Sequence, residues 1–173
     1  MATARNVFQN PVPDLRVLRQ RHTALDELHF GYTRMATLLE NIARCSKEGR
    51  SARIFVEEST ATHLLGEQVR SIALETGRRI GLCSCNELSD ALEIARLRLR
   101  EYTYKKSSMD GILLGLLDVR KLLLQTWQKV LSNLGDLANM AVQQTIIEAR
   151  DQEMRLVAEL ARRVGRRELP GSR

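Results

Sequence analysis

The chain has 173 residues, with 27 Lys and Arg against 21 Asp and Glu, which gives a formal net charge of +6. Hydrophobic residues make up 43% and charged residues 28%, a balance that excludes a wholly disordered chain and a membrane protein. Aromatic residues are only 4%, so any core must consist mainly of aliphatic side chains.

Proline is confined to the two ends of the chain. The three prolines are Pro11, Pro13 and Pro170, which leaves residues 14–169 without one. Proline inside a helix costs about 3 kcal/mol, and no hairpin turn lies between alternating apolar runs. The sequence therefore predicts an all-α fold: an antiparallel helical bundle of four to five long helices with coiled-coil-like packing.

Three parts are expected along the chain. Residues 1–13 are predicted to be a flexible N-terminal segment, residues 14–165 a single helical bundle domain, and residues 166–173 a basic C-terminal tail.

The first predicted helix follows Asp14, whose carboxylate can accept hydrogen bonds from the free amides of the first turn. Spacings of four and three residues then alternate, as is typical of a helix packed along its length. The residues of this stripe are Leu18, His22, Leu25, His29, Tyr32, Ala36, Leu39 and Ala43. Gly49 is expected to close the helix, since glycine readily adopts the left-handed conformation.

The second and third predicted helices carry similar stripes. Ser51 is expected to cap the second helix, which ends at Gly77 and has the stripe Phe55, Glu58, Thr62, Leu65, Val69 and Ile72. The third begins at a capping box formed by Ser84 and Glu87, whose side chains can satisfy each other's backbone amides. Its stripe is Leu88, Leu92, Ala95, Leu99 and Tyr102.

The last part of the chain contains two stripes in different phases. The first stripe is Leu116, Arg120, Leu123, Trp127, Val130, Leu134, Leu137 and Ala141, and the second is Met140, Ile147, Met154, Val157, Ala161 and Val164. A phase shift marks either a helix break or a stutter in one long helix. Because no proline or turn cluster interrupts residues 109–164, we predict one continuous or gently bent helix, about 84 Å long at 1.5 Å per residue. Two separate helices are the alternative.

Two groups of side chains are weak candidates for a metal site. His22, Asp26 and His29 lie within two turns of the first helix, and carboxylate–imidazole sets bind metals in helical bundles. Cys83 and Cys85 precede the third helix, where free amides favour a thiolate. Neither group completes a known ligand pattern, so the favoured interpretation is partly buried histidines and helix-capping residues, with no metal and no cofactor.

Recognisable catalytic motifs are missing from the sequence. There is no Gly-x-Ser-x-Gly, P-loop or dinucleotide-binding glycine loop, and the adjacent acids Glu57 and Glu58 lack a recognisable acid–base partner. We therefore expect that the protein is not an enzyme.

The expected compartment is the cytoplasm, with the nucleus as the alternative. Three cysteines without a secretory signal favour a reducing environment. The most apolar window, residues 112–124, contains three charged residues and is shorter than the roughly 20 residues that a membrane span needs. No transmembrane segment is predicted.

Polar residues on the stripes are candidates for contact with a partner. Glu58 and Arg120 occupy positions that a self-sufficient core would fill with apolar side chains. Polar positions in a helical seam often fix its register or mark where a partner begins.

The segment of residues 127–139 resembles the short interaction helix by which cell-death regulators dock into a groove. Trp127, Leu131 and Leu134 stand at three anchor positions, and Gly135-Asp136 follows. The resemblance implies binding to a partner through these anchors, although Leu137 stands where an acidic residue is expected. The alternative is a core helix in which Gly135 permits close approach of another helix.

Arginine is concentrated near the C-terminus. Residues 162–173 contain five arginines and one glutamate, and arginine clusters attract phosphates of nucleic acids or acidic lipids. The candidate anion-binding residues are Arg162, Arg163, Arg166 and Arg167.

The leading hypothesis is a non-enzymatic protein-protein interaction module, an adaptor or assembly subunit that pairs its amphipathic helices with partner helices. Its partners could form a homo- or hetero-oligomer with it. The alternative is a nucleic-acid or anionic-surface binding protein that uses the C-terminal arginine cluster.

Overall fold

The computed structural model describes residues 15–46, 49–81, 86–105, 108–134 and 139–168, and the predicted N-terminal segment 1–13 lies outside them. The described residues form helices and no strand. The helices are α1 (Leu15–Cys45), α2 (Gly49–Glu75), α3 (Asn86–Lys105), α4 (Met109–Leu134) and α5 (Met140–Glu168). The all-α helical bundle predicted from the sequence is confirmed.

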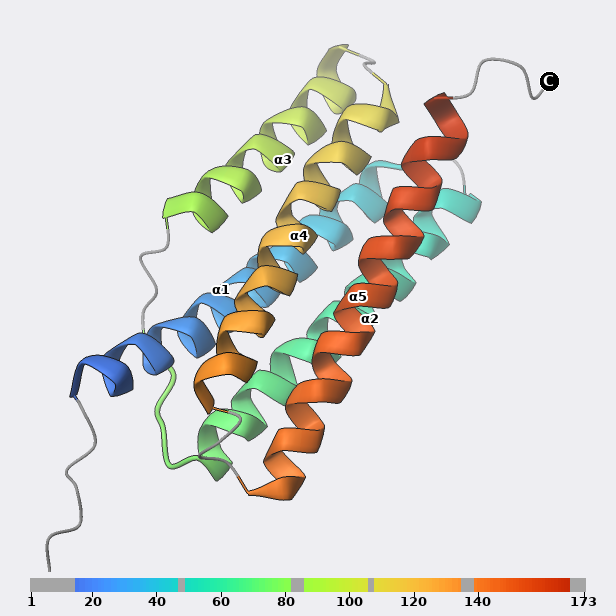
Figure 1. Ribbon diagram of the computed structural model, residues 1–173. Helices are drawn as coiled ribbons and strands as arrows, with labels where there is room; N and C mark the ends of the chain where they lie inside the picture. The colour runs from blue at the N-terminus through green and yellow to red at the C-terminus, as the bar shows by residue number, and fades with distance from the viewer. Residues whose placement is uncertain (1–14, 47–48, 82–85, 106–107, 135–138, 169–173) are drawn as a thin grey trace, which may run out of the picture.

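Four of the helices form a ring, and α3 lies outside it (Figure 1). In the ring, α1 packs against α2, α2 against α5, α5 against α4, and α4 against α1. Consecutive helices run in opposite directions, as Figure 1 shows. Helix α3 packs more extensively on α4 than on α1.

The stripes predicted on the first four helices supply most of the core. On α2 every member of the predicted stripe is buried, including the polar Glu58 and Thr62. On α1 the buried face is centred on Leu28, Met35 and Ile42, so that His29 lies at its edge and is only half-buried.

The ends of the helices follow local capping rules. Gly77 has φ of 68°, and the amide of Arg78 donates to the carbonyl of Ala73 at 2.7 Å, which closes α2 as expected. The Ser108 hydroxyl accepts from the amide of Asp110 at 3.1 Å and caps α4. Helix α2, however, begins at Gly49, two residues before the predicted cap, so the expectation for Ser51 is wrong.

The prediction of one continuous helix over residues 109–164 is also wrong. Helix α4 ends at Leu134, and α5 begins at Met140 and packs back against α4. Asn139 starts the new helix, because its side-chain oxygen accepts from the amide of Val142 at 2.9 Å. Folding back places the apolar side chains of α5 against α4 and α2, whereas a straight helix would leave them without a covering surface.

The predicted stripe of α5 is only partly correct, because Val157 and Val164 pack against the core but its methionines do not. Met140 is 86% exposed and Met154 is 51% exposed, although both were expected inside. The buried residues of α5 are Val142, Ile146, Ala149, Glu153 and Leu160. A glutamate occupies the centre of this face because it pairs with Arg120 of α4.

No helix in the described parts of the chain combines the length and the apolar character that crossing a membrane requires.

Candidate functional site

Polar side chains from all four helices of the ring meet inside the bundle. Arg120 and Glu153 are fully buried, and Glu58 is 7% exposed. Together they belong to a hydrogen-bonded group, here named the buried polar cluster, which consists of Tyr32, Glu58, Thr62, Arg120, Trp127, Glu153 and Arg163.

Arg120 lies at the centre of the buried polar cluster. Its Nη1 donates to both carboxylate oxygens of Glu153 at 3.2 Å, and its Nη2 donates to the hydroxyl of Thr62 at 3.0 Å. The same Nη2 lies 4.0 Å from Oε2 of Glu58. A single guanidinium therefore joins α4 to α5 and α2.

Tyr32 and Trp127 extend the cluster to α1. The indole Nε1 of Trp127 donates to the Tyr32 hydroxyl at 2.5 Å, and that hydroxyl donates to Oε2 of Glu153 at 3.1 Å. Buried tyrosine and tryptophan need such partners for their polar atoms. The contacts supply them and fix both rings.

Arg163 and Glu58 form the edge of the cluster nearest to solvent, with side chains 28% and 8% exposed. Arg163 of α5 donates to Oε1 of Glu58 at 2.6 Å and also to Glu159 at 3.2 Å. Two buried atoms, Oε2 of Glu58 and Nε of Arg120, have no hydrogen-bond partner. The hydrogen-bonding capacity of the cluster is therefore not fully used, and each such atom lowers the stability of the fold by about 1–3 kcal/mol.

Burial changes the proton affinity of the acidic groups. It raises the pKa of Glu153 and, with Arg120 and Arg163 opposing it, the pKa of Glu58. Arg120 likewise opposes the rise in the pKa of Glu153. Burial also raises the pKa of Tyr32 well above its usual value, which keeps the hydroxyl proton available for Glu153.

The cluster holds helices in register rather than presenting groups to solvent. Three residues predicted to bind a partner, Glu58, Arg120 and Trp127, have their side chains inside this chain. Their burial leaves almost no side-chain area for a second molecule in this conformation. Leu131 is half-buried against the core, and the side chain of Leu134 lies outside the described residues.

Sequence reasoning identified Arg120 as unusual but missed its counter-ion. Glu153 follows Val142, Ile146 and Ala149 at spacings of four, three and four residues, which is the phase of a buried helical face. An acid in that phase, together with an arginine on the buried stripe of the preceding helix, could have indicated a buried ion pair.

The proposed metal ligands do not assemble among the described side chains. His29 accepts a hydrogen bond from Nε of Arg70 at 2.9 Å, and Asp26 accepts one from the amide of Gly81 at 2.7 Å. The described residues contain no group of three or more potential metal ligands. The side chains of His22, Cys83 and Cys85 lie outside the described part.

Two of the four candidate anion-binding arginines already have acidic partners. Arg162 pairs with Glu159, and Arg163 pairs with Glu159 and with Glu58. The side chains of Arg166 and Arg167 are not among those described.

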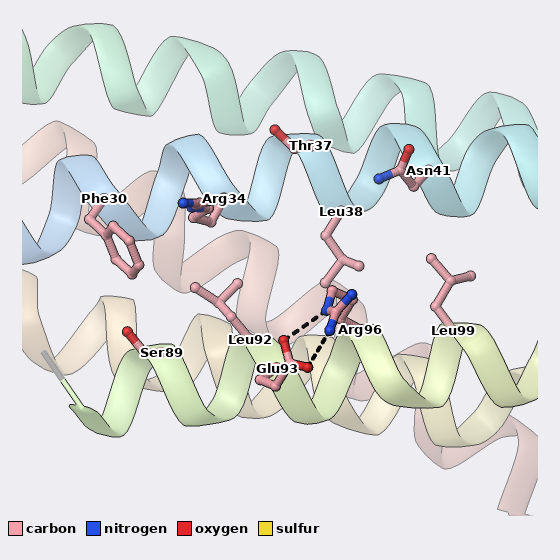
Figure 2. A pocket seen from close by; sticks show the side chains of 10 residues that line it. All are labelled: Phe30, Arg34, Thr37, Leu38, Asn41, Ser89, Leu92, Glu93, Arg96 and Leu99. Carbon is pink, nitrogen blue, oxygen red and sulfur yellow. Dashed lines mark hydrogen bonds and ion pairs between the residues drawn. The ribbon is translucent and has the colours of Figure 1, made fainter. Parts of the chain in front are cut away.

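A groove lies between α1 and α3. It has a volume of about 480 Å³. It is lined by Phe30, Arg34, Thr37, Leu38 and Asn41 from α1 and by Ser89, Leu92, Glu93, Arg96 and Leu99 from α3. In Figure 2, Phe30 and Leu38 extend toward α3, and Leu92 and Leu99 extend toward α1. We call it the α1–α3 groove.

The floor of the α1–α3 groove is apolar and its rim is polar. Leu38, Leu92 and Leu99 are 6%, 8% and 7% exposed and belong to the core. The rim includes Arg96, which donates to both carboxylate oxygens of Glu93 at 2.7 and 2.5 Å. A ligand in this groove would meet leucine side chains below and charged or amide groups beside it.

Close packing at α4 positions the two walls of the groove. A Cβ on Gly31 of α1 would lie 2.5 Å from Leu123 of α4 and 2.7 Å from Leu88 of α3. A Cβ on Gly115 of α4 would lie 3.1 Å from Ala95 of α3. Both walls therefore rest tightly on α4, and the groove lies between them.

No protein-family model, curated protein or solved structure matches this chain. Its function must be inferred from the side chains described above.

Proposed function

We propose that the protein is a non-enzymatic protein-protein interaction module, which binds a helix of a partner protein in the α1–α3 groove. The partner helix would lie along α1 and α3 and add to the bundle. The role is that of an adaptor or an assembly subunit.

The α1–α3 groove is the observation that supports this proposal. It extends from Phe30 to Asn41 on α1 and from Ser89 to Leu99 on α3, about 15 Å or three helical turns at 1.5 Å per residue. Amphipathic helices bind such grooves through apolar anchors one turn apart. The leucine floor would receive the anchors, and the polar rim would contact the flanks.

The buried polar cluster supports a stable receptor for such a helix. It links α1 to α4 and α5 through Tyr32, Trp127 and Glu153. A wall fixed in this way binds with less loss of conformational freedom than a mobile one.

The alternative of an anionic-surface binder receives less support. Arg162 and Arg163 would have to give up ion pairs with Glu159 and Glu58 in order to bind phosphates. The competing carboxylates lower the local positive potential.

The proposal can be tested with a designed helix-stapled peptide of about four to five turns. The peptide has leucine at positions i, i+4 and i+7 and glutamine elsewhere, so that it carries no charge. Its binding to the full chain is followed by fluorescence anisotropy. The blocking variant is Thr37→Trp/Asn41→Trp, which places two indoles one turn apart at exposed positions of the groove.

A matched control is Thr60→Trp/Leu64→Trp, an exposed pair with the same spacing on α2, outside the groove. We expect saturable binding to the unmodified chain and to the control. The blocking variant should bind at least about tenfold more weakly, equivalent to about 1.4 kcal/mol. Equal binding by all three chains, or no saturable binding to the unmodified chain, would overturn the proposal.

A further inference from the structure

A second pocket continues the α1–α3 groove toward α2. It has a volume of about 930 Å³ and is more open, and it is lined by His29, Phe30, Thr33, Arg34, Thr37, Arg70, Ile80 and Gly81. Phe30, Arg34 and Thr37 line both pockets. A helix longer than the groove would therefore pass directly over Arg34 and reach Arg70.

The combined surface carries an excess of positive charge. Its lining includes Arg34, Arg70 and Arg96 against Glu93 as the acid, a formal sum of +2. Arg70 also forms an exposed ion pair with Glu67 at 3.2 Å, so Arg34 contributes most of the unpaired positive charge. Burial and the neighbouring Arg70 lower the pKa of His29 below 6.5, so this imidazole adds no charge at neutral pH. Glu93 is already bound by Arg96 through two hydrogen bonds.

Arg34 is the cation best placed to meet a partner. It is exposed, and its guanidinium lies 5.7 Å from the centre of the Phe30 ring. No described carboxylate forms an ion pair with it. Its contact with the ring orients the guanidinium, and Arg34 lines both pockets.

Building on the proposed function, we propose that the partner helix is acidic, with carboxylates on the flank that passes Arg34 and Arg70 and leucine-like anchors in the groove. The arginine fork suits a carboxylate because two N–H groups can donate to its two oxygens. The apolar floor supplies affinity, and the arginines select an acidic helix over a basic one.

The test uses the stapled peptide described above in two charged forms. One form carries glutamate at two flank positions, and the other carries lysine at the same positions. The unmodified chain should bind the glutamate form about tenfold more tightly than the lysine form at low ionic strength. The ratio should shrink as salt is added, because both arginines are exposed.

Reversing the charge of Arg34, and then of Arg34 and Arg70 together, should change the preference for the glutamate peptide in two steps. Arg34→Glu reduces the formal sum of the surface from +2 to 0 and should abolish the preference for glutamate. Arg34→Glu/Arg70→Glu should invert it. The control is Arg155→Glu on α5, a helix that packs against α2 and α4, and it should leave the preference unchanged.

The outcomes separate this inference from the proposed function. Binding of the uncharged peptide with no difference between the glutamate and lysine forms would overturn the proposal of an acidic partner but would still support helix binding in the groove. If Arg155→Glu abolishes the preference as strongly as Arg34→Glu does, the preference comes from the net charge of the chain. That result would also overturn the proposal of an acidic partner. Self-association that Thr37→Trp/Asn41→Trp removes would assign the groove to a second copy of this chain instead.

Discussion

Replacing Arg120 with methionine is the most direct perturbation of the buried polar cluster. Arg120→Met removes a fully buried cation that bonds both oxygens of Glu153 and the hydroxyl of Thr62. Removing one partner of a buried ion pair typically costs about 3–5 kcal/mol. For a chain of this size that lowers the melting temperature by about 6–20 °C.

The cost of Arg120→Met should grow as the pH rises. Burial already raises the pKa of Glu58 and of Glu153 above 4.5, and Arg120 opposes both shifts. A carboxyl whose pKa is raised in the folded state binds more protons there than when unfolded, so stability falls as the pH rises from 4.5 through the folded pKa. Without Arg120 both folded pKa values are higher still. The loss of stability is therefore smallest near pH 4 and largest near pH 8.

Urea unfolding followed by helical circular dichroism and by the fluorescence of Trp127, the single tryptophan, measures this cost. Adding Glu153→Gln to Arg120→Met removes a buried carboxylate that has lost its cation, and it should recover about 2 kcal/mol of the lost stability. Arg155→Met, the same change at an exposed position of α5, should stay within about 0.5 kcal/mol of the unmodified chain. A cost below about 1 kcal/mol for Arg120→Met, or one that is constant with pH, would refute the reasoning.

Three further predictions concern stability. Tyr32→Phe removes a hydroxyl that accepts from an indole and donates to a buried carboxylate, and it should cost about 2 kcal/mol in urea unfolding; an unchanged midpoint would contradict it. Gly31→Ala would place a Cβ 2.5 Å from a leucine side chain and should cost about 1–3 kcal/mol. Gly165→Ala meets nothing within 4 Å and should stabilise α5 by about 0.5–1 kcal/mol. Thermal melts in which Gly165→Ala is the less stable of the two variants would count against this packing. Burial lowers the pKa of His29 from 6.5, so the contribution of the neutral imidazole to stability is present above pH 6.5 and is lost as the pH falls through the folded pKa. His29→Gln should therefore flatten the stability profile below pH 6.5. A profile identical to that of the unmodified chain would exclude the effect.

The candidate site was only partly accessible to sequence reasoning. Arg120 and Glu58 stood out because they interrupt apolar stripes, but the sequence favoured an external partner as the explanation. The internal partners come from other helices: Glu153 is 33 residues from Arg120, and Arg163 is 105 residues from Glu58. A stripe shows which residues turn inward, whereas the neighbours they meet depend on how the helices pack.

The α1–α3 groove was not predicted, because it depends on packing that no stripe records. The residues of its floor, such as Leu92 and Leu99, were predicted as ordinary core positions. The groove forms because both walls pack against α4, at Gly31 and at Gly115, so its shape depends on contacts between three helices.

The sequence by itself determined that the chain is helical and which faces of α1 to α4 are buried. Helical period and the absence of proline act within one segment, so a local pattern suffices to reveal them. Only the tertiary structure decided that the chain turns back before Met140, that Glu153 lies in the core, and that α1 and α3 leave a groove. Each of these depends on atoms from different helices, because an ion pair becomes stable in the core only when the packing of the helices brings its two charges together.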